Sequence, residues 1–360
     1  MTSDPRPHLL DFPIEDLRER FARDGIAPYR AQQVASWLYA RGVDDPHAMT
    51  DLPQDLRERL AAEWRSRALE VGELQRSVDG TVKARLVAAD GAVLESVAIP
   101  DDDRTTLCIS TQVGCPLACS FCATGTLGLT RNLATAEIVD QLLRMRAALG
   151  PERRITNLVF MGMGEPLLNL PNVLRAIRLL MHPKALGYAG RRITVSTAGI
   201  VPKIGPLLEA APVNLAVSLH ATTDALRDEL VPLNRRFPLD VLLGELRARK
   251  EIGPKRPVFF EYTLIDGVND APEDARRLVR LLAGLPSKVN VIPLNPHPGS
   301  PYRTPGMDVA SRFLGILSAA GLTVTLRRSR GADIDAACGQ LAARPAAPPT
   351  RLGAGVAAPA

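Results

Sequence analysis

Apolar residues near the start of this chain recur at intervals of three and four. Ile14, Leu17 and Phe21 form one such stripe. This spacing places apolar side chains on one face of a helix, and glycine or proline breaks separate successive helices. We therefore predict a small helical domain over residues 1–80, with its last helix ending near Glu63.

A different pattern follows, in which apolar and polar residues alternate over residues 81–100. The alternation is interrupted at Asp90-Gly91, a dipeptide that supplies the left-handed backbone conformation of a tight hairpin turn. We expect a β-hairpin that links the helical domain to the rest of the chain. On pattern alone, Glu95 within it is a solvated strand residue.

From Thr105 onward, short apolar runs alternate with stretches of helical periodicity. The strand-like runs are residues 105–110, 155–161, 192–196, 214–219, 258–264 and 289–294, and the helix-like stretches are residues 135–149, 171–181, 203–210, 239–252 and 272–283. These units predict an α/β fold, a parallel sheet curled into an incomplete (βα)6 barrel over residues 101–342. We expect a last helix and strand, residues 307–320 and 323–327, to cover one side. The Ala-, Pro- and Gly-rich tail, 343–360, is expected to be disordered.

Composition adds weaker constraints. The chain has 360 residues, with 44 basic against 39 acidic side chains and a net charge of +5, which permits an RNA partner without establishing one. The basic clusters that could contact phosphate, each equally suited to a solvated face, are Arg191-Arg192, Arg235-Arg236, Lys255-Arg256 and Arg327-Arg328-Arg330. Aromatic residues make up only 4%, so we expect no broad platform for base stacking. No apolar run is long enough for a membrane span, and we expect a monomer without a membrane partner.

Three of the five cysteines crowd into one Cys-x3-Cys-x2-Cys segment, Cys115, Cys119 and Cys122. Iron–sulfur clusters normally take four protein ligands, so a triplet would leave one iron of a [4Fe-4S] cluster open to a small chelating molecule. A structural zinc site, with Cys338 or His220 as its fourth ligand, is an alternative, although zinc sequences usually carry two Cys-x2-Cys pairs. Disulfides are not expected, because the cysteine count is odd and the first residues lack a secretory signal. Both features favour a reducing cytoplasm.

Other unusual residues stand where the predicted strands end, which is where a parallel barrel carries its active site. After the triplet, which follows the first strand, they are Gly162-Met163-Gly164-Glu165, Ser196-Thr197, Ser218-Leu219-His220 and Asn295-Pro296. Gly162 and Gly164 suit a backbone that approaches a ligand closely, and Glu165 suits an ammonium group. We expect these motifs to meet on one rim. A lone histidine such as His220 is otherwise common as a core residue.

The triplet and the sequence Phe-Met-Gly-Met-Gly-Glu-Pro at residues 160–166 resemble the radical S-adenosylmethionine (SAM) superfamily. Within it, the chain resembles the ribosomal RNA adenine-C2 methyltransferase family, RlmN, from about Phe12 to Leu341. The resemblance implies a [4Fe-4S] cluster on Cys115, Cys119 and Cys122, and SAM bound by Gly164, Glu165, Ser196, Ser218, Leu219, His220 and Asn295. It also implies methylation at C2 of adenine 2503 in 23S ribosomal RNA and of adenine 37 in transfer RNAs. A reductant would supply electrons, and the helical domain would hold RNA.

Three more residues acquire roles through this resemblance. The C2 carbon of adenine is electron-poor and bears an unactivated C–H bond, so a radical route is needed. The resemblance implies that Cys338, on a polar segment predicted to be flexible, carries the methyl group, and that Glu95 removes the C2 proton. Cys108 would then attack the sulfur of Cys338, which releases the product and leaves a disulfide. Without the resemblance, Cys108 is a small apolar strand residue.

Two other functions remain open at this point. A C8 methyltransferase acting on the same adenine would share the triplet and both lone cysteines. A zinc-stabilised RNA-binding module without enzymatic activity belongs to a different class. Pro166, Arg330-Gly331 and the long helical N-terminus resemble the C2 family.

Overall fold

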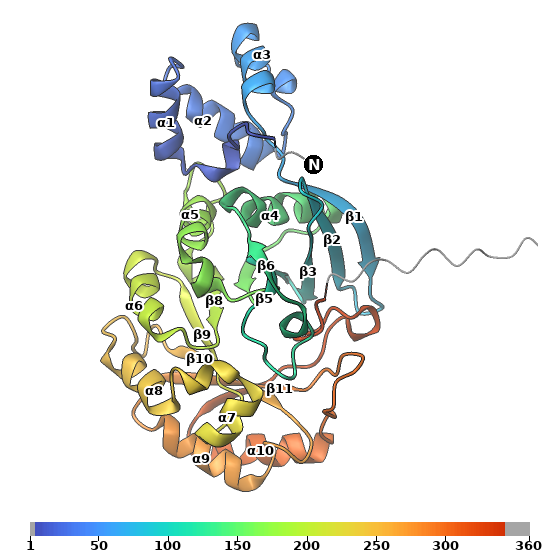
Figure 1. The fold of residues 1–360 in the computed structure, drawn as a ribbon, viewed down its shortest axis with the longest axis vertical. Helices are drawn as coiled ribbons and strands as arrows, with labels where there is room; N and C mark the ends of the chain where they lie inside the picture. The colour runs from blue at the N-terminus through green and yellow to red at the C-terminus, as the bar shows by residue number, and fades with distance from the viewer. Residues whose placement is uncertain (1–3, 343–360) are drawn as a thin grey trace, which may run out of the picture.

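The computed structural model describes residues 4–342, and its central feature is one ten-stranded sheet (Figure 1). The strand order is β1-β2-β3-β4-β7-β8-β9-β10-β11-β12. The bounds are β1 Leu69–Arg76, β2 Val82–Ala88, β3 Val93–Asp101, β4 Arg104–Cys108, β7 Asn157–Phe160, β8 Ile193–Thr197, β9 Asn214–Ser218, β10 Val258–Leu264, β11 Ser287–Pro293 and β12 Thr323–Leu326. Strands β1 to β4 pair antiparallel, and every pairing from β4 through β7 to β12 is parallel.

The parallel half is the predicted incomplete (βα)6 barrel. Its helices are α4 Thr135–Leu149, α5 Leu170–Met181, α6 Val201–Ala210, α7 Asp224–Leu230, α8 Leu239–Ala248, α9 Pro272–Leu282 and α10 Met307–Ala319. The strands are apolar along most of their length because helices and the barrel interior bury both faces. Strand β12 extends the sheet beside β11. The predicted disorder of the tail, 343–360, lies outside the described residues.

The N-terminal helices α1 (Ile14–Arg23), α2 (Arg30–Ala35) and α3 (Gln54–Glu63) lie at one end of the molecule (Figure 1). They are joined to the barrel through α4, because Asp11 Oδ1 accepts a hydrogen bond of 2.8 Å from the Ala136 amide in the first turn of that helix. This contact satisfies an amide that the helix itself leaves unpaired. No helix within residues 4–342 has the length and apolar character to cross a membrane.

The region between the helices and the barrel differs from the prediction. Strand β1 lies inside residues 1–80, where only helices were expected. It pairs antiparallel with β2, the first strand of the predicted hairpin β2–β3. Strand β1 is an edge strand with mostly exposed side chains. It therefore lacks the alternation of apolar and polar residues that would have predicted a strand. Its strand conformation is stabilised by pairing with β2.

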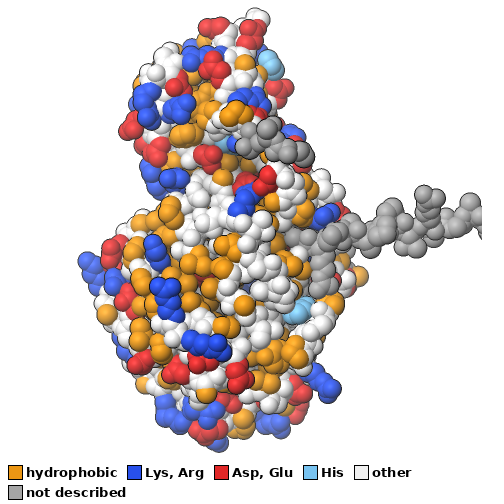
Figure 2. Space-filling model, viewed as in Figure 1, with side chains coloured by type: hydrophobic (Ala, Val, Ile, Leu, Met, Phe, Trp, Pro, Cys, Tyr) orange, Lys and Arg blue, Asp and Glu red, His pale blue; other side chains and the backbone are white. Residues whose placement is uncertain are grey.

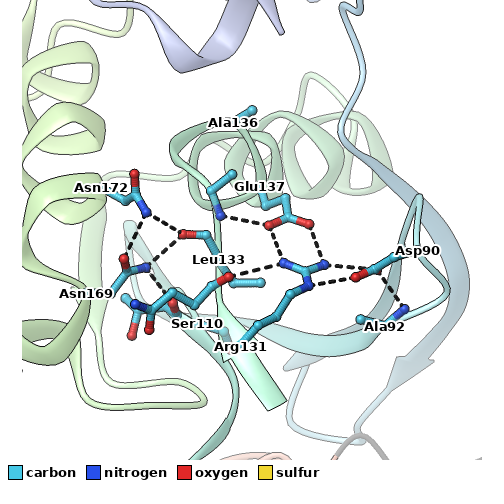
Figure 3. A network of polar contacts seen from close by, with 12 residues as sticks. Asp90, Ala92, Ser110, Arg131, Leu133, Ala136, Glu137, Asn169 and Asn172 are labelled. Carbon is cyan, nitrogen blue, oxygen red and sulfur yellow. Dashed lines mark hydrogen bonds and ion pairs between the residues drawn. The ribbon is translucent and has the colours of Figure 1, made fainter. Parts of the chain in front are cut away.

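A second small sheet brackets the cysteine triplet and was also missed. It pairs β5 (Gln112–Cys115) with β6 (Gly128–Asn132). Arg131 on β6 makes ion pairs of 2.7 Å with Asp90 and 2.8 Å with Glu137, so it ties this hairpin both to the β2–β3 turn and to α4 (Figure 3). Strands this short carry too few apolar positions to show a period.

Candidate active site

One cavity opens at the carboxyl ends of the parallel strands, with an empty space of about 920 Å³. This space includes the open mouth of the cavity. Among the predicted site residues, those lining it are Cys115, Cys119, Cys122, Gly164, Glu165, Ser196, Ser218, His220, Asn295 and Cys338. Motifs that are far apart in the sequence therefore meet on one rim.

The cysteine triplet begins at the end of β5 and continues through a short loop. Cys115, Cys119 and Cys122 are free and partly exposed, and the Cys122 amide donates to the Cys119 carbonyl at 3.1 Å. Burial raises the pKa of Cys115 to about 12 and raises that of Cys119 as well. Thiols in this setting need a nearby cation to ionise, which is what a coordinated metal supplies. Three soft sulfur ligands on one cavity wall thus fit an iron–sulfur cluster.

No group of three or more His, Cys, Asp or Glu side chains among residues 4–342 converges closely enough to hold one metal ion. Such convergence is not required of cluster ligands, because each thiolate binds a different iron of a [4Fe-4S] cluster.

The glycines after β7 also have a role in packing, which the sequence did not indicate. A Cβ on Gly162 would lie 2.6 Å from the Ser110 hydroxyl, and one on Gly164 would lie 2.5 Å from Gln112 Cβ. Both positions line the cavity. The atoms that leave no room for a Cβ belong to residues 109–112 of the same chain. Gly164 also has a φ of +95°, which side chains disfavour.

Glu165 is buried at the start of the turn Pro166–Asn169. Its Oε1 accepts from the Leu167 amide at 3.0 Å and its Oε2 from the Ala198 amide at 2.8 Å. Burial nevertheless raises the pKa of Glu165 to about 7, with these backbone donors opposing the shift. A ligand ammonium group would stabilise the ionised form.

The remaining predicted contacts divide into two groups. Ser196, Ser218 and Asn295 line the cavity, and the Ser329 hydroxyl donates to Asn295 Oδ1. Leu219 does not line it: its side chain is buried in the core, and its amide and carbonyl are hydrogen-bonded to Glu261 and Arg227. No direct contact with a ligand in this cavity is therefore open to Leu219 in this conformation.

His220 lines the cavity in a left-handed backbone conformation, with a φ of 58°. Its Nδ1 accepts a hydrogen bond of 3.0 Å from the Thr263 amide, and its ring packs edge-on against Phe121 at 4.7 Å between centroids. Burial lowers the pKa of His220 to about 3. The ring is therefore neutral at physiological pH.

The segment around Cys338, predicted to be flexible, is held at several points. The Ser77 hydroxyl donates to Asp333 at 2.6 Å, and the Gly331 amide donates to Asp79 at 2.9 Å. The carbonyl of Gly339 accepts from the Ala123 amide in the cysteine loop at 2.7 Å. The sequence did not reveal these contacts, because the partners of this segment come from distant parts of the chain.

Cys338 and Cys108 differ in their access to the cavity. Cys338 is exposed and lines the cavity, whereas Cys108 is buried at the end of β4 and does not line it. Burial, with a further contribution from the nearby Cys338 thiol, raises the pKa of Cys108 to about 12. The Cys338 thiol thus lies near enough to Cys108 to influence its ionisation.

Glu95 is buried, not solvated as the alternation suggested. Its Oε2 accepts from the Ala342 amide at 3.0 Å, and its Oε1 lies 3.5 Å from Lys83 Nζ. The C-terminal segment covers the face of β3 that the pattern would have left in solvent. Glu95 itself is not among the residues that line the cavity.

Comparison with known proteins decides the family. The radical SAM superfamily model matches residues 109–280, and the ribosomal RNA large subunit methyltransferase N-terminal domain matches residues 7–65. A protein named dual-specificity RNA methyltransferase RlmN from Anaeromyxobacter dehalogenans is 50% identical over 349 residues, covering 94% of this chain and 93% of that protein. The chain belongs to the RlmN family.

A second RlmN protein and a solved structure support this assignment to the RlmN family. The RlmN protein of Geobacter sulfurreducens is 50% identical over 328 residues, covering 91% of this chain and 90% of its own length. A crystal structure of a radical SAM methyltransferase from Sphaerobacter thermophilus superposes with a TM-score of 0.90 at 46% identity, covering 94% of this chain and all of that one. The helical domain and barrel therefore both belong to a known architecture.

Two buried charged residues of this RlmN-family chain were missed by sequence reasoning. Arg227 donates to the carbonyls of Ala198, Ser218 and Leu219, at 2.7 to 3.1 Å, and so fixes the ends of β8 and β9. Glu261 lines the cavity, and its Oε2 has no hydrogen-bond partner among the described residues. The signal for Glu261 was a single acidic residue in the apolar strand Val258–Leu264.

The basic clusters do not all remain available to RNA. Arg256 donates to the carbonyls of Ala211 and Val213, so it has a structural task. Arg191, Arg235, Arg236, Lys255 and Arg328 are exposed. On the face drawn in Figure 2, Lys and Arg side chains are scattered among acidic ones over both parts of the molecule.

Proposed function

We propose that this RlmN-family chain methylates the C2 carbon of adenine in RNA by radical SAM chemistry. One observation carries the proposal: a single cavity gathers the cysteine triplet, every candidate SAM contact except Leu219, and Cys338, whose thiol is near enough to influence the ionisation of Cys108. The relatives named dual-specificity RNA methyltransferases cover more than nine tenths of the chain, which supports an RNA substrate.

Cys115, Cys119 and Cys122 would hold the [4Fe-4S] cluster. A bound, reduced cluster would supply the electron needed for reductive cleavage of SAM. Glu165 would accept a hydrogen bond from the SAM ammonium group, and Ser196, Ser218, His220 and Asn295 would contact the rest of the molecule. These polar groups stand on an otherwise largely apolar wall, which fixes orientation and limits water.

The chain's own residues would then divide the remaining work. Cys338 would carry the methyl group as a thioether and present it to the adenine. After the new carbon bond forms, Glu95 would take the C2 proton from the adduct. The Cys108 thiolate would then attack the sulfur of Cys338 and break its bond to the new carbon. The electron pair of that bond stays on the carbon, which takes up a proton to become the methyl group, and the two cysteines are left as a disulfide that cellular thiols reduce.

The substrates we propose are adenine 2503 of 23S ribosomal RNA and adenine 37 of transfer RNAs. The phrase "dual-specificity" in the names of the relatives supports two RNA classes. We propose that the N-terminal helices hold the RNA and that the protein acts as a monomer. A reductant and the thiols that reopen the disulfide would be available in the cytoplasm.

Mass spectrometry of RNA nucleosides tests the reaction. Ribosomal and transfer RNA lacking the modification would be incubated with anaerobically reconstituted protein, SAM and a reductant. We expect 2-methyladenosine in both RNAs. A product carrying the methyl group at C8 would replace the proposal with the C8 reaction, and a protein that holds zinc but no iron would overturn it.

A further inference from the structure

Lys83 and Glu95 form a buried ion pair beneath the segment that carries Cys338. Lys83 on β2 lies opposite Val97 on β3, so Glu95 is its diagonal neighbour on the same face of the sheet. Lys83 Nζ lies 3.5 Å from Glu95 Oε1, and the two side chains are only 9% and 7% exposed. Lysine is almost never buried to this extent without a partner.

The same two residues also hold the chain on either side of Cys338. Lys83 Nζ donates to the carbonyl of Asp335 at 3.3 Å, and the Ala342 amide donates to Glu95 Oε2 at 3.0 Å. Asp335 precedes Cys338 by three residues and Ala342 follows it by four. The ion pair is therefore attached to both flanks of the proposed methyl carrier.

We propose that Lys83 is a positioning residue that keeps the Glu95 carboxylate and the segment 335–342 in a fixed relation during the reaction. This inference rests on the proposed function, in which Glu95 takes a proton from the RNA adduct on Cys338. In the structure, Glu95 does not line the cavity, and its Oε2 is occupied by the Ala342 amide. Glu95 therefore has to move before it can act, and Lys83 would guide that movement.

To reach a proton in the cavity, Glu95 must move from its present position, which breaks the hydrogen bond from the Ala342 amide and leaves Lys83 as its remaining partner. The long lysine stem can follow the carboxylate over a short displacement, which a backbone amide cannot. Without Lys83, the released carboxylate would be buried without a compensating charge, an arrangement that strongly disfavours the ionised form. Lys83 would thus act through Glu95 and touch neither SAM nor RNA.

The test is Lys83→Met in a protein that retains Cys108. Methyl loading of Cys338 and addition to RNA precede the proton removal, so both should continue. Release of product should slow on the order of tenfold to a hundredfold, since a positioned base contributes at least this much. RNA covalently joined to the protein should accumulate as a slow band on a denaturing gel, while KM for RNA stays unchanged.

Two further variants make the comparison specific. Lys83→Arg keeps the positive charge and should restore most of the product release. Lys203→Met removes an equivalent charge from the exposed surface of α6 and should behave as the unchanged protein. Iron content and 5′-deoxyadenosine formation, measured in every variant, show whether the cluster site has survived. If the methionine variant does not fold, Lys83→Gln takes its place in the comparison.

Normal turnover by Lys83→Met, or adduct trapping as strong in Lys83→Arg as in Lys83→Met, would overturn the role of Lys83. Loss of both adduct and product with iron content intact would also overturn it, because Lys83 would then act before addition. Failure of the proposed function gives a distinguishable result. In that case Cys108→Ala, with Lys83 unchanged, would form no covalent RNA adduct at all.

Discussion

Gly164 shows that packing, as well as ligand contact, fixes residue identity at the cavity. Gly164 has a φ of +95°, which disfavours a side chain. A Cβ at this position would also lie only 2.5 Å from Gln112 Cβ. Nearby, His220 and Glu165 are polar groups whose protonation is set by burial. The glycines at residues 162 and 164 indicated that other atoms lie close to this backbone, but the sequence did not show that these atoms include residues 109–112.

We predict that Gly164→Ala destabilises the protein far more than Gly91→Ala. Gly91 in the β2–β3 turn has a φ of +84° with nothing within 4 Å of a Cβ, so alanine there meets only backbone strain of about 1 kcal/mol. Alanine at Gly164 adds an overpacking cost of about 1–3 kcal/mol. Denaturant unfolding of the cluster-free protein measures both, and equal losses would contradict the packing argument.

His220 predicts a specific acid dependence. The folded-state pKa of about 3 lies below the value of about 6.5 in an unfolded chain, so the unfolded state binds the proton more readily. The stability that His220 contributes is complete above pH 6.5 and is lost progressively as the pH falls toward 3. Between pH 6.5 and 4.5 the loss should be about 2–3 kcal/mol.

The corresponding experiment compares His220→Gln with His47→Gln, an exposed control, in the cluster-free protein. The His220 variant should show a shallower loss of unfolding free energy on acidification, whereas the His47 variant should follow the unchanged protein. Identical slopes for the two variants would show that His220 titrates normally.

At the scale of elements, the β5–β6 hairpin connects the cysteine loop to its surroundings. Arg131 bridges Asp90 and Glu137, and Glu137 in turn accepts from the Ala134 amide at the start of α4 (Figure 3). Beside it, the Asn169 and Asn172 side chains donate to the Leu133 carbonyl at 2.8 and 3.1 Å. The hairpin is thus fixed from two sides.

We predict that Arg131→Met lowers the unfolding free energy by on the order of 1 kcal/mol, because the paired guanidinium is only partly exposed and binds both carboxylates. The cluster should also be lost faster on exposure to a chelator, since the hairpin carries Cys115. Arg312→Met removes an ion pair whose side chains are 67% and 72% exposed, and it should change neither quantity. Equal unfolding free energies and equal rates of cluster loss in the two variants would show that the Arg131 ion pairs do not hold the hairpin in place.

The sequence predicted well those helices and strands that have a regular spacing of apolar residues. Helix α4 was expected over residues 135–149 and forms Thr135–Leu149, and the six barrel strands lie where the apolar runs placed them. Strand β1 was missed because its side chains are exposed and its stability comes from pairing. Helix α7 was missed because it is short and follows the His220 turn closely.

At the scale of the whole molecule, the C-terminal segment closes the site by contacts that span the chain. Residues 331–342 bond to the β1–β2 turn, to Glu95 and to the cysteine loop. The rim of the barrel was predictable, because parallel strands end on one side. The burial of Glu95 was not, because its covering segment follows it by more than two hundred residues.

We propose that Cys338 carries the methyl group and that Cys108 releases the product. Cys338 lines the cavity, and Cys108 is buried but near enough for the Cys338 thiol to influence its ionisation, which supports this division. Loss of Cys338 should stop the reaction before any carbon bond forms. Loss of Cys108 should stop it afterwards.

Denaturing gel electrophoresis of Cys108→Ala incubated with RNA, SAM and reductant tests this claim most directly. We predict a slow band of RNA joined to protein that ribonuclease collapses, and no such band with Cys338→Ala or the double variant. Normal turnover by Cys108→Ala, or a covalent band that survives the loss of Cys338, would contradict the claim.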